Sequence, residues 1–300
     1  MSLKRVLLLS VIFLNLSCKA QEIIPLYKGT APGSLPVKDN ESSSNSTKGA
    51  GRFYVTNVTR PTITVFLPKK INPSRTAMII CPGGGYSRLS IEDGGYEAAK
   101  VLADSGIVAI VLKYRTWQDS AYTDYKKAPL LDLQQAMDIV YNNATKWHID
   151  TSHIGILGFS AGGHLTAMAA TTFKLHRPAF TILAYPVISF LDSLTSKTSN
   201  SRNNLLGKHI TPEEKIAYSP ELHITNATPP AFIVHAADDN TSLVGNSIAY
   251  YNGLIANKVS AQLLLYKTGG HGFALYNKTE DKYWMPSAIK WLSQNGFYKN

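Results

Sequence analysis

A serine in a glycine-rich turn is the clearest chemical signal in the sequence. Residues 158–162 read Gly-Phe-Ser-Ala-Gly, between a strand-like apolar run at 154–157 and a helix-forming run at 161–172. A serine in a sharp strand-to-helix turn projects its hydroxyl toward a substrate, and small neighbours are needed because the backbone is cramped. The start of the following helix would add a partial positive charge beside it. An ordinary glycine-rich turn has the same pattern, so catalysis by Ser160 depends on partners elsewhere in the chain.

A serine hydroxyl is inert without a base, and His271 is the best candidate for that base. It lies in the run Gly-Gly-His-Gly at 269–272, directly after the last strand that the sequence predicts. The glycines would let this loop curl over the serine. His235 and His164 are the alternatives. His235 ends a predicted strand and is expected to be packed, and His164 lies on the serine's helix and is carried away from the hydroxyl.

The imidazole needs a carboxylate that fixes its tautomer and stabilises its cation. Asp238 and Asp239 follow the penultimate predicted strand, and either could supply it. Aspartates at such a position also serve as turn residues, and one of the two is expected to do so. The sequence therefore contains a nucleophile, a base and an acid, in a form suited to acyl transfer.

Acyl transfer also needs donors for an oxyanion. The run Pro-Gly-Gly-Gly-Tyr at 82–86 follows an early strand and can present bare N–H groups, and the N–H of Ala161 would add another. A glycine-rich loop can also bind phosphate, but this one lacks the Lys-Ser/Thr of a P-loop and the spacing of a dinucleotide fingerprint. The eight histidines show no metal-binding pattern. Neither a metal nor another cofactor is expected.

These residues need a scaffold that brings distant loops together. From residue 55 onward, predicted strands alternate with predicted helices, which favours an α/β fold with a doubly wound, mostly parallel sheet and helices on both faces. Such a sheet places its site at the carboxyl ends of its strands. The loops that carry Gly83, Ser160, Asp239 and His271 all follow strands, so they should converge at one edge.

The individual elements can be assigned from apolar periodicity. We expect strands at 55–67 (an antiparallel edge strand), 76–81, 107–114, 154–157, 180–186, 231–235 and 261–266. Helices are expected at 95–105, 128–144, 161–172, 247–256 and 287–292. The polar stretch 189–230 is long enough to be a lid or binding insert, and a capping box at Thr211 should begin a short helix within it.

The chain is expected to contain a signal peptide at 1–20, an extended leader and polar loop at 21–54, and one catalytic domain at 55–300. A basic start followed by an apolar run at 6–16, too short for a stable membrane anchor, predicts export to the periplasm or the cell exterior. Cleavage before Gln21 is favoured, but Cys18 could also carry a lipid anchor. No other membrane contact is expected.

Composition bounds the remaining function classes. The net charge is +10, but lysines and arginines are scattered, which indicates a basic solvated surface rather than nucleic-acid binding. Only Cys81 is certain to remain after processing, so no intramolecular disulfide is expected. The oligomeric state is left open.

Several motifs together carry a family resemblance. They are Ile-Cys-Pro-Gly-Gly-Gly-Tyr at 80–86, Leu-Lys-Tyr-Arg at 112–115, Ile-Leu-Gly-Phe-Ser-Ala-Gly-Gly-His-Leu at 156–165, Tyr-Pro at 185–186, Ser-Pro at 219–220, Thr-Pro-Pro at 228–230 and Gly-Gly-His-Gly-Phe at 269–273. With these motifs, and with the order serine, aspartate, histidine, the chain resembles the α/β-hydrolase superfamily. It looks most like the bacterial acetyl esterase and acetylxylan esterase branch related to hormone-sensitive lipase.

The resemblance implies roles for individual residues. Ser160 would be the nucleophile and His271 the base, with oxyanion donors at Gly84, Gly85 and Ala161. In related loops the working carboxylate lies about four residues beyond the His or Gly that ends the strand, which favours Asp239 over Asp238. Two departures are notable: Pro82 replaces the histidine that opens the oxyanion loop in lipase-type members, and Asn-Thr-Ser at 240–242 stands where many relatives have Val-Pro.

The resemblance also implies a function: a secreted serine esterase that removes small acyl groups, acetyl in particular, from plant polysaccharides such as xylan through an acyl-serine intermediate. Its substrate would be an acylated carbohydrate or small ester. One alternative is a serine exopeptidase of the same fold, which usually carries an N-terminal β-propeller for which this chain has no room. The other is a non-catalytic carbohydrate-binding protein, which the intact Ser, Asp and His set argues against.

Overall fold

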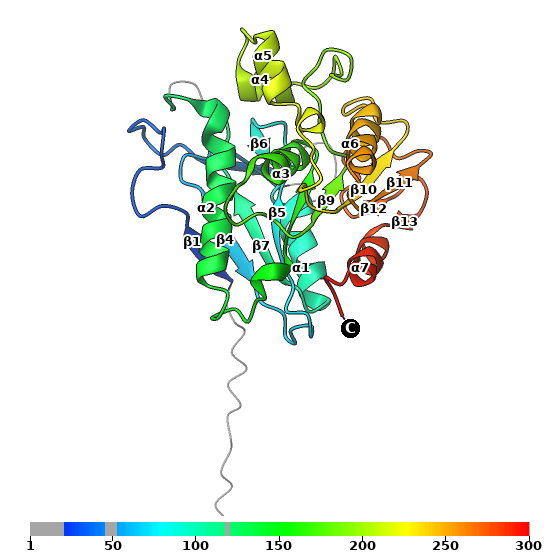
Figure 1. Cartoon of the computed structure of the whole chain (residues 1–300). Coiled ribbons are helices and arrows are strands. Elements are labelled where there is room, and N and C mark those ends of the chain that lie inside the picture. The colour runs from blue at the N-terminus through cyan, green and yellow to red at the C-terminus, as the bar shows by residue number, and fades with distance from the viewer. Residues whose placement is uncertain (1–20, 46–52, 118–120, 300) are drawn as a thin grey trace, which may run out of the picture.

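The computed structural model describes residues 21–45, 53–117 and 121–299 (Figure 1). The expected signal peptide at 1–20, with Cys18, lies outside the described residues. Residues 46–52, in the polar loop expected before residue 54, also lie outside the described residues.

An eight-stranded sheet forms the centre of the molecule, in the order β1-β4-β7-β5-β8-β9-β10-β11. Every neighbouring pair from β7 to β11 is parallel, whereas β4 pairs antiparallel with both β1 and β7. The strand bounds are β1 Glu22–Pro25, β4 Thr62–Phe66, β5 Ala77–Cys81, β7 Val108–Lys113, β8 Ile154–Phe159, β9 Thr181–Ala184, β10 Ala231–Ala236 and β11 Ala261–Tyr266. All residues of β5, β8, β9 and β10 are buried, which explains why their sequences are almost entirely apolar.

Helices cover both faces of this sheet, as predicted (Figure 1). They are α1 Glu97–Asp104, α2 Ala128–Asn142, α3 Ala161–Thr172, α6 Gly245–Ala256 and α7 Met285–Gln294, and a π-helix, Glu92–Tyr96, leads into α1. Successive residues of β8 define the two faces. Gly158 faces α3, whereas the Phe159 ring contacts Trp284, the residue directly before α7. The doubly wound, mostly parallel sheet inferred from the sequence is therefore confirmed.

The prediction of one edge strand at 55–67 was wrong. The structure has two strands there, β3 (Phe53–Thr56) and β4, with Pro61 between them. Proline lacks an N–H and restrains the residue before it, so the alternating pattern cannot continue as one ladder through this point. In addition β4 is not at the edge, because β1 pairs with its outer side.

The expected leader is extended, but it is built into the fold. Besides β1, it contributes β2 (Ser42–Asn45), in what was expected to be a loop, and β2 pairs with β3. With β6 (Arg88–Leu89) these strands form a separate three-stranded sheet. The division of the chain at residue 54 stays a prediction, but β3 crosses that boundary.

A buried ion pair fastens the leader to the core. Arg115, which follows β7, and Asp132, on α2, are both fully buried, and the Arg115 Nη2 lies 2.8 Å from the Asp132 Oδ1. Arg115 also donates to the Pro32 carbonyl oxygen at 2.7 Å, and the Tyr27 hydroxyl donates to Asp132 at 3.1 Å. Arg115 donates to the Ser34 hydroxyl as well, so three partners of this buried pair come from the leader.

Replacing Arg115 with methionine should lower the free energy of unfolding by about 3–5 kcal/mol, because Asp132 would be left buried without its cation. Urea denaturation followed by circular dichroism measures this loss. Lys146→Met is the matched control, since Lys146 and Glu22 form an ion pair at the surface whose loss should cost at most about 1 kcal/mol. Equal unfolding midpoints for the two variants would contradict the assigned role of the buried pair.

The long insert lies over the carboxyl ends of the strands (Figure 1). It contains α4 (Ser201–Leu206) and α5 (Pro212–Ala217). The predicted capping box is present: the Thr211 hydroxyl accepts from the Glu214 N–H at 3.2 Å, and the Glu214 carboxylate accepts from the Thr211 N–H at 3.0 Å. A short hairpin, β12 (Tyr276–Asn277) and β13 (Lys282–Tyr283), precedes α7.

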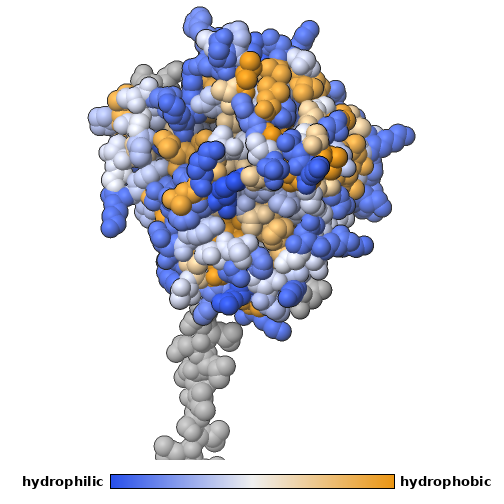
Figure 2. Space-filling model, viewed as in Figure 1, coloured by the Kyte–Doolittle hydropathy of each residue, from blue (hydrophilic) through white to orange (hydrophobic). Residues whose placement is uncertain are grey.

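The surface has no single dominant apolar area on the side drawn in Figure 2, where apolar patches alternate with hydrophilic side chains. Among the described helices, none combines the length and the apolar character needed to cross a membrane.

Candidate active site

Ser160 lies at the tight turn between β8 and α3, with φ 53° and ψ −117°. This left-handed conformation is strained for a residue with a Cβ and is typical of functional turns. The flanking glycines are required by close approach. A Cβ at Gly158 would lie 2.3 Å from the Gly162 carbonyl oxygen, and one at Gly162 would lie 2.1 Å from that of Cys81. The Ser160 N–H donates to the Ala184 carbonyl oxygen at 3.0 Å, which ties the turn to the neighbouring strand.

The His271 imidazole lies over this turn. Its Nε2 is 2.8 Å from the Ser160 Oγ, so the ring is in place to accept the hydroxyl proton. The loop that carries it reaches this position through Gly269, Gly270 and Gly272, all with positive φ. Asp238 stabilises the loop, because its carboxylate accepts a hydrogen bond from the Gly270 N–H at 2.8 Å.

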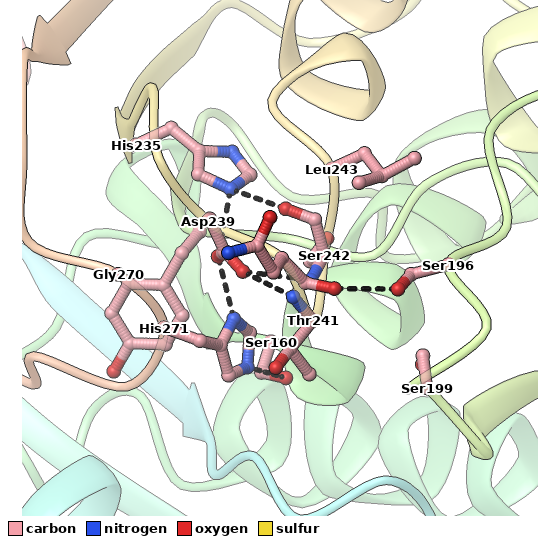
Figure 3. A network of polar contacts seen from close by, with 12 residues as sticks. Ser160, Ser196, Ser199, His235, Asp239, Thr241, Ser242, Leu243, Gly270 and His271 are labelled. Carbon is pink, nitrogen blue, oxygen red and sulfur yellow. Dashed lines mark hydrogen bonds and ion pairs between the residues drawn. The ribbon is translucent and has the colours of Figure 1, made fainter.

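Asp239, and not Asp238, contacts the imidazole. The His271 Nδ1 lies 2.6 Å from the Asp239 Oδ2, while Oδ1 accepts from the N–H groups of Thr241 and Ser242 at 2.8 and 2.9 Å (Figure 3). Burial alone would raise the pKa of this carboxyl. The hydrogen bonds from His235, His271 and Ser242 outweigh burial and hold the pKa below its usual value. Asp239 is therefore a carboxylate at neutral pH.

The rings of the two alternative histidines bond to groups other than the Ser160 hydroxyl. His164 is fully buried, with Nδ1 2.7 Å from the Tyr86 hydroxyl and Nε2 2.8 Å from the Tyr218 carbonyl oxygen. Burial lowers the pKa of His164 to about 4, so it is neutral at pH 7. His235 is packed, as expected, but its Nε2 also lies 3.1 Å from the Asp239 Oδ2, a contact that sequence spacing did not reveal.

The glycine-rich loop lies against the serine. A Cβ at Gly83 would be 3.1 Å from the Ser160 Cβ, and Gly84 and Gly85 have φ of 134° and 64°. Ala161 is the first residue of α3, where N–H groups lack intrahelical partners.

Side chains to which the sequence analysis assigned no role fix this loop. The Tyr114 hydroxyl donates to the Pro82 carbonyl oxygen at 2.8 Å, and the Tyr125 hydroxyl donates to that of Tyr86 at 2.9 Å. From the insert, the Asn204 amide donates to the Gly85 carbonyl oxygen at 2.7 Å. These bonds connect residues far apart in sequence, so no local sequence pattern predicts them.

The serine opens into a cavity of about 440 Å³ with polar walls. Residues of the insert form one wall: Thr198, Ser199, Asn200, Ser201 and Asn204. Tyr54 and Arg88, from the three-stranded sheet, belong to another part of the lining, with the Arg88 guanidinium 4.4 Å from the centre of the Tyr54 ring. Hydroxyl, amide and guanidinium groups suit a hydrated, oxygen-rich ligand.

Within residues 21–45, 53–117 and 121–299, no three His, Cys, Asp or Glu side chains are grouped so that they could hold a metal ion.

A mostly parallel sheet with a serine elbow after β8, an acid after β10 and a histidine after β11 is the arrangement of an α/β-hydrolase. The model of the BD-FAE family matches residues 63–254. The chain belongs to the BD-FAE family.

Named relatives agree with this class. An acetylxylan esterase of Xylanibacter ruminicola is 38% identical over 213 residues, which are 69% of this chain and 42% of the relative. The endo-1,4-beta-xylanase B of Butyrivibrio fibrisolvens is 32% identical over 68% of this chain and 33% of its own. The chain thus spans less than half the length of these two curated relatives.

Solved structures have the same fold over nearly the whole chain. An acetyl ester-xyloside bifunctional hydrolase from Caldicellulosiruptor lactoaceticus has a TM-score of 0.74 at 27% identity, covering 93% of this chain and 97% of that one. A carboxylesterase from Lactobacillus plantarum has a TM-score of 0.66 at 24% identity, covering 88% and 100%, and supports the fold alone.

Proposed function

We propose that this protein is a serine carboxylic-ester hydrolase that removes small acyl groups, chiefly acetyl, from plant polysaccharides such as xylan. The observation that carries the proposal is the continuous line of hydrogen bonds from the Ser160 hydroxyl through His271 to Asp239, at the floor of an open polar cavity. Each group has the partner that acyl transfer requires.

The reaction follows from these contacts. The Ser160 Oγ attacks the ester carbonyl carbon while its proton passes to the His271 Nε2, and Asp239 stabilises the imidazolium. The N–H groups of Gly84, Gly85 and Ala161 would stabilise the oxyanion. The tetrahedral intermediate then expels the alcohol, which takes the proton from His271 and leaves an acyl-serine. Water next gives its proton to His271 and attacks this ester, the carboxylic acid leaves, and the proton returns to the Ser160 oxygen.

The substrate assignment is supported by the walls of the cavity and by the relatives. The hydroxyl and amide side chains of 198–204 match the hydrogen-bonding groups of a sugar. Two relatives are named for xylan, one as an acetylxylan esterase, and the related solved hydrolase is described as acting on an acetyl ester. An acetylated xylan chain is the substrate that these features share.

Three substrates test the proposal against its alternatives. Purified protein should release p-nitrophenol from p-nitrophenyl acetate and acetate from acetylated xylan, and should leave an aminoacyl-p-nitroanilide intact. Cleavage of the anilide alone would indicate an exopeptidase. Binding of xylan without turnover of either ester would indicate a carbohydrate-binding protein. Acetate release from a panel of native acetylated polysaccharides would then rank the natural substrates.

Short acyl chains should be preferred. More of the lining is polar than apolar, so each methylene added to the acyl chain should gain less than the roughly 0.8 kcal/mol that full burial would give. We expect kcat/KM for p-nitrophenyl acetate to exceed that for the octanoate. An equal or higher value for the octanoate would contradict this assignment of the cavity.

We also propose that the protein is exported to the periplasm or beyond, with cleavage before Gln21 favoured over lipidation of Cys18. The basic and apolar start of the chain supports export. Fractionation of the producing cells, followed by mass spectrometry of the mature N-terminus, distinguishes a free Gln21 from a lipid-modified Cys18. An intact Met1 in the cytoplasm would contradict export.

A further inference from the structure

A second buried histidine contacts the acid of the site, and the reaction above gives it no role. His235 is the last residue but one of β10 and is fully buried. Its Nε2 lies 3.1 Å from the Asp239 Oδ2 and 2.9 Å from the Ser242 carbonyl oxygen. Figure 3 shows His235 and His271 on opposite sides of the Asp239 carboxylate. Because both partners of this nitrogen are acceptors, the His235 Nε2 must carry a hydrogen.

The other ring nitrogen indicates the charge of the ring. The His235 Nδ1 lies 2.7 Å from the hydroxyl of Ser247, a fully buried residue on α6. If Nδ1 accepts this bond, both polar hydrogens have a partner: the Ser247 hydroxyl hydrogen bonds to Nδ1, and the hydrogen on the His235 Nε2 bonds to Asp239 and Ser242. If the ring were a cation, both nitrogens would donate, and the Ser247 hydroxyl hydrogen would have no acceptor among the described residues. A neutral ring with its hydrogen on Nε2 therefore satisfies the site.

This bond completes the coordination of the carboxylate. The Asp239 Oδ1 accepts from two backbone N–H groups, and Oδ2 accepts from the two imidazoles. A carboxylate has about four lone-pair sites, and each one is used here. The backbone bonds hold Oδ1 only, so the His235 bond restrains Oδ2, the oxygen that meets His271. As a neutral donor, His235 leaves the negative charge of Asp239 available to the imidazolium that forms during the reaction.

We propose that His235 is a positioning residue for ester hydrolysis: its Nε2–H holds the Asp239 Oδ2 in line with the His271 Nδ1. It acts through Asp239 and does not touch the substrate. This inference rests on the proposed function for its kinetic consequence, but the arrangement of the three side chains can be tested without any substrate.

Two polar substitutions that differ by one methylene separate positioning from packing. In His235→Gln the side-chain nitrogen can reach the place of Nε2 and donate to Asp239, whereas in His235→Asn it reaches only as far as Nδ1. We expect Asn to lower kcat by about 10–100-fold with KM changed less than about threefold, since a hydrogen bond to a charged group is lost. Gln should restore most of kcat. Val234→Ala, one residue earlier in β10, is the control: it opens a cavity in the buried core but should keep kcat within about threefold of wild type.

A proton NMR experiment supplies the second readout. The short bond between the His271 Nδ1 and Asp239 should give a low-field resonance in the resting protein, which moves in His235→Asn and stays in His235→Gln and Val234→Ala. Absence of ester hydrolysis by the wild type would refute the proposed function, while the resonance would still test positioning. A folded Asn variant with wild-type kcat or an unmoved resonance, or a Gln variant as slow as the Asn variant, would overturn the inference.

Discussion

Replacing Ser160 with alanine is expected to lower kcat by about 10⁴-fold or more, because the oxygen that forms the acyl-enzyme is removed. The variant should fold like the wild type. Alanine keeps the Cβ that the turn already accommodates at φ 53°, and the substitution removes only one atom that faces the cavity. The measurement is steady-state hydrolysis of p-nitrophenyl acetate, with circular dichroism to verify the fold.

Covalent labelling gives an independent check on the same residue. An organophosphonate should add to Ser160 of the wild type, as seen in the mass of the peptide that contains it, and should not label the alanine variant. If the folded variant kept a tenth of the wild-type activity, Ser160 would not be the nucleophile.

Asp239→Asn should cost about 10⁴-fold in kcat near neutral pH, with little change in the shape of the site. The reason is the tautomer of His271. A carboxylate at 2.6 Å from Nδ1 requires the ring hydrogen there and leaves Nε2 free to accept the Ser160 proton. An amide can donate to Nδ1 instead, which places the ring hydrogen on Nε2 and abolishes the base.

Asp238→Asn is the matched control for this experiment. The Asp238 side chain is exposed and bonds to the Gly270 N–H, a bond that an amide oxygen can keep in weaker form. The variant should therefore be less stable and remain active. An inactive Asp238→Asn beside an active Asp239→Asn would reverse the two assignments and leave the serine and histidine roles intact.

Much of the fold could be predicted because its signals are local. The wholly apolar runs of β5 and β8 follow from burial on both sides, and the elbow follows from the steric need for glycine on each side of Ser160. Because each of the loops with Ser160, Asp239 and His271 follows a parallel strand, their convergence also follows from topology.

The missed features depend on distant partners. β1 and β2 are four residues each. They are strands because β1 pairs with β4 and β2 pairs with β3, and their own composition does not predict this. The contact between His235 and Asp239 depends on which way a ring turns at the end of a strand. Spacing along the chain places the two residues near each other but does not determine that rotation.

The buried Arg115 has a consequence for the order of folding. The bond between Tyr27 and Asp132 joins residues 105 apart in sequence, and the bond from Arg115 to the Pro32 carbonyl oxygen joins residues 83 apart. Closing loops of this length costs conformational entropy, and the contacts that offset this cost form only once the loop is closed. These bonds should therefore form late. The residues after Gln21 leave the ribosome early, but they cannot take their final place until β7 and α2 exist. Until then this end of the chain stays accessible to chaperones and proteases, and added protease should cut it first during refolding.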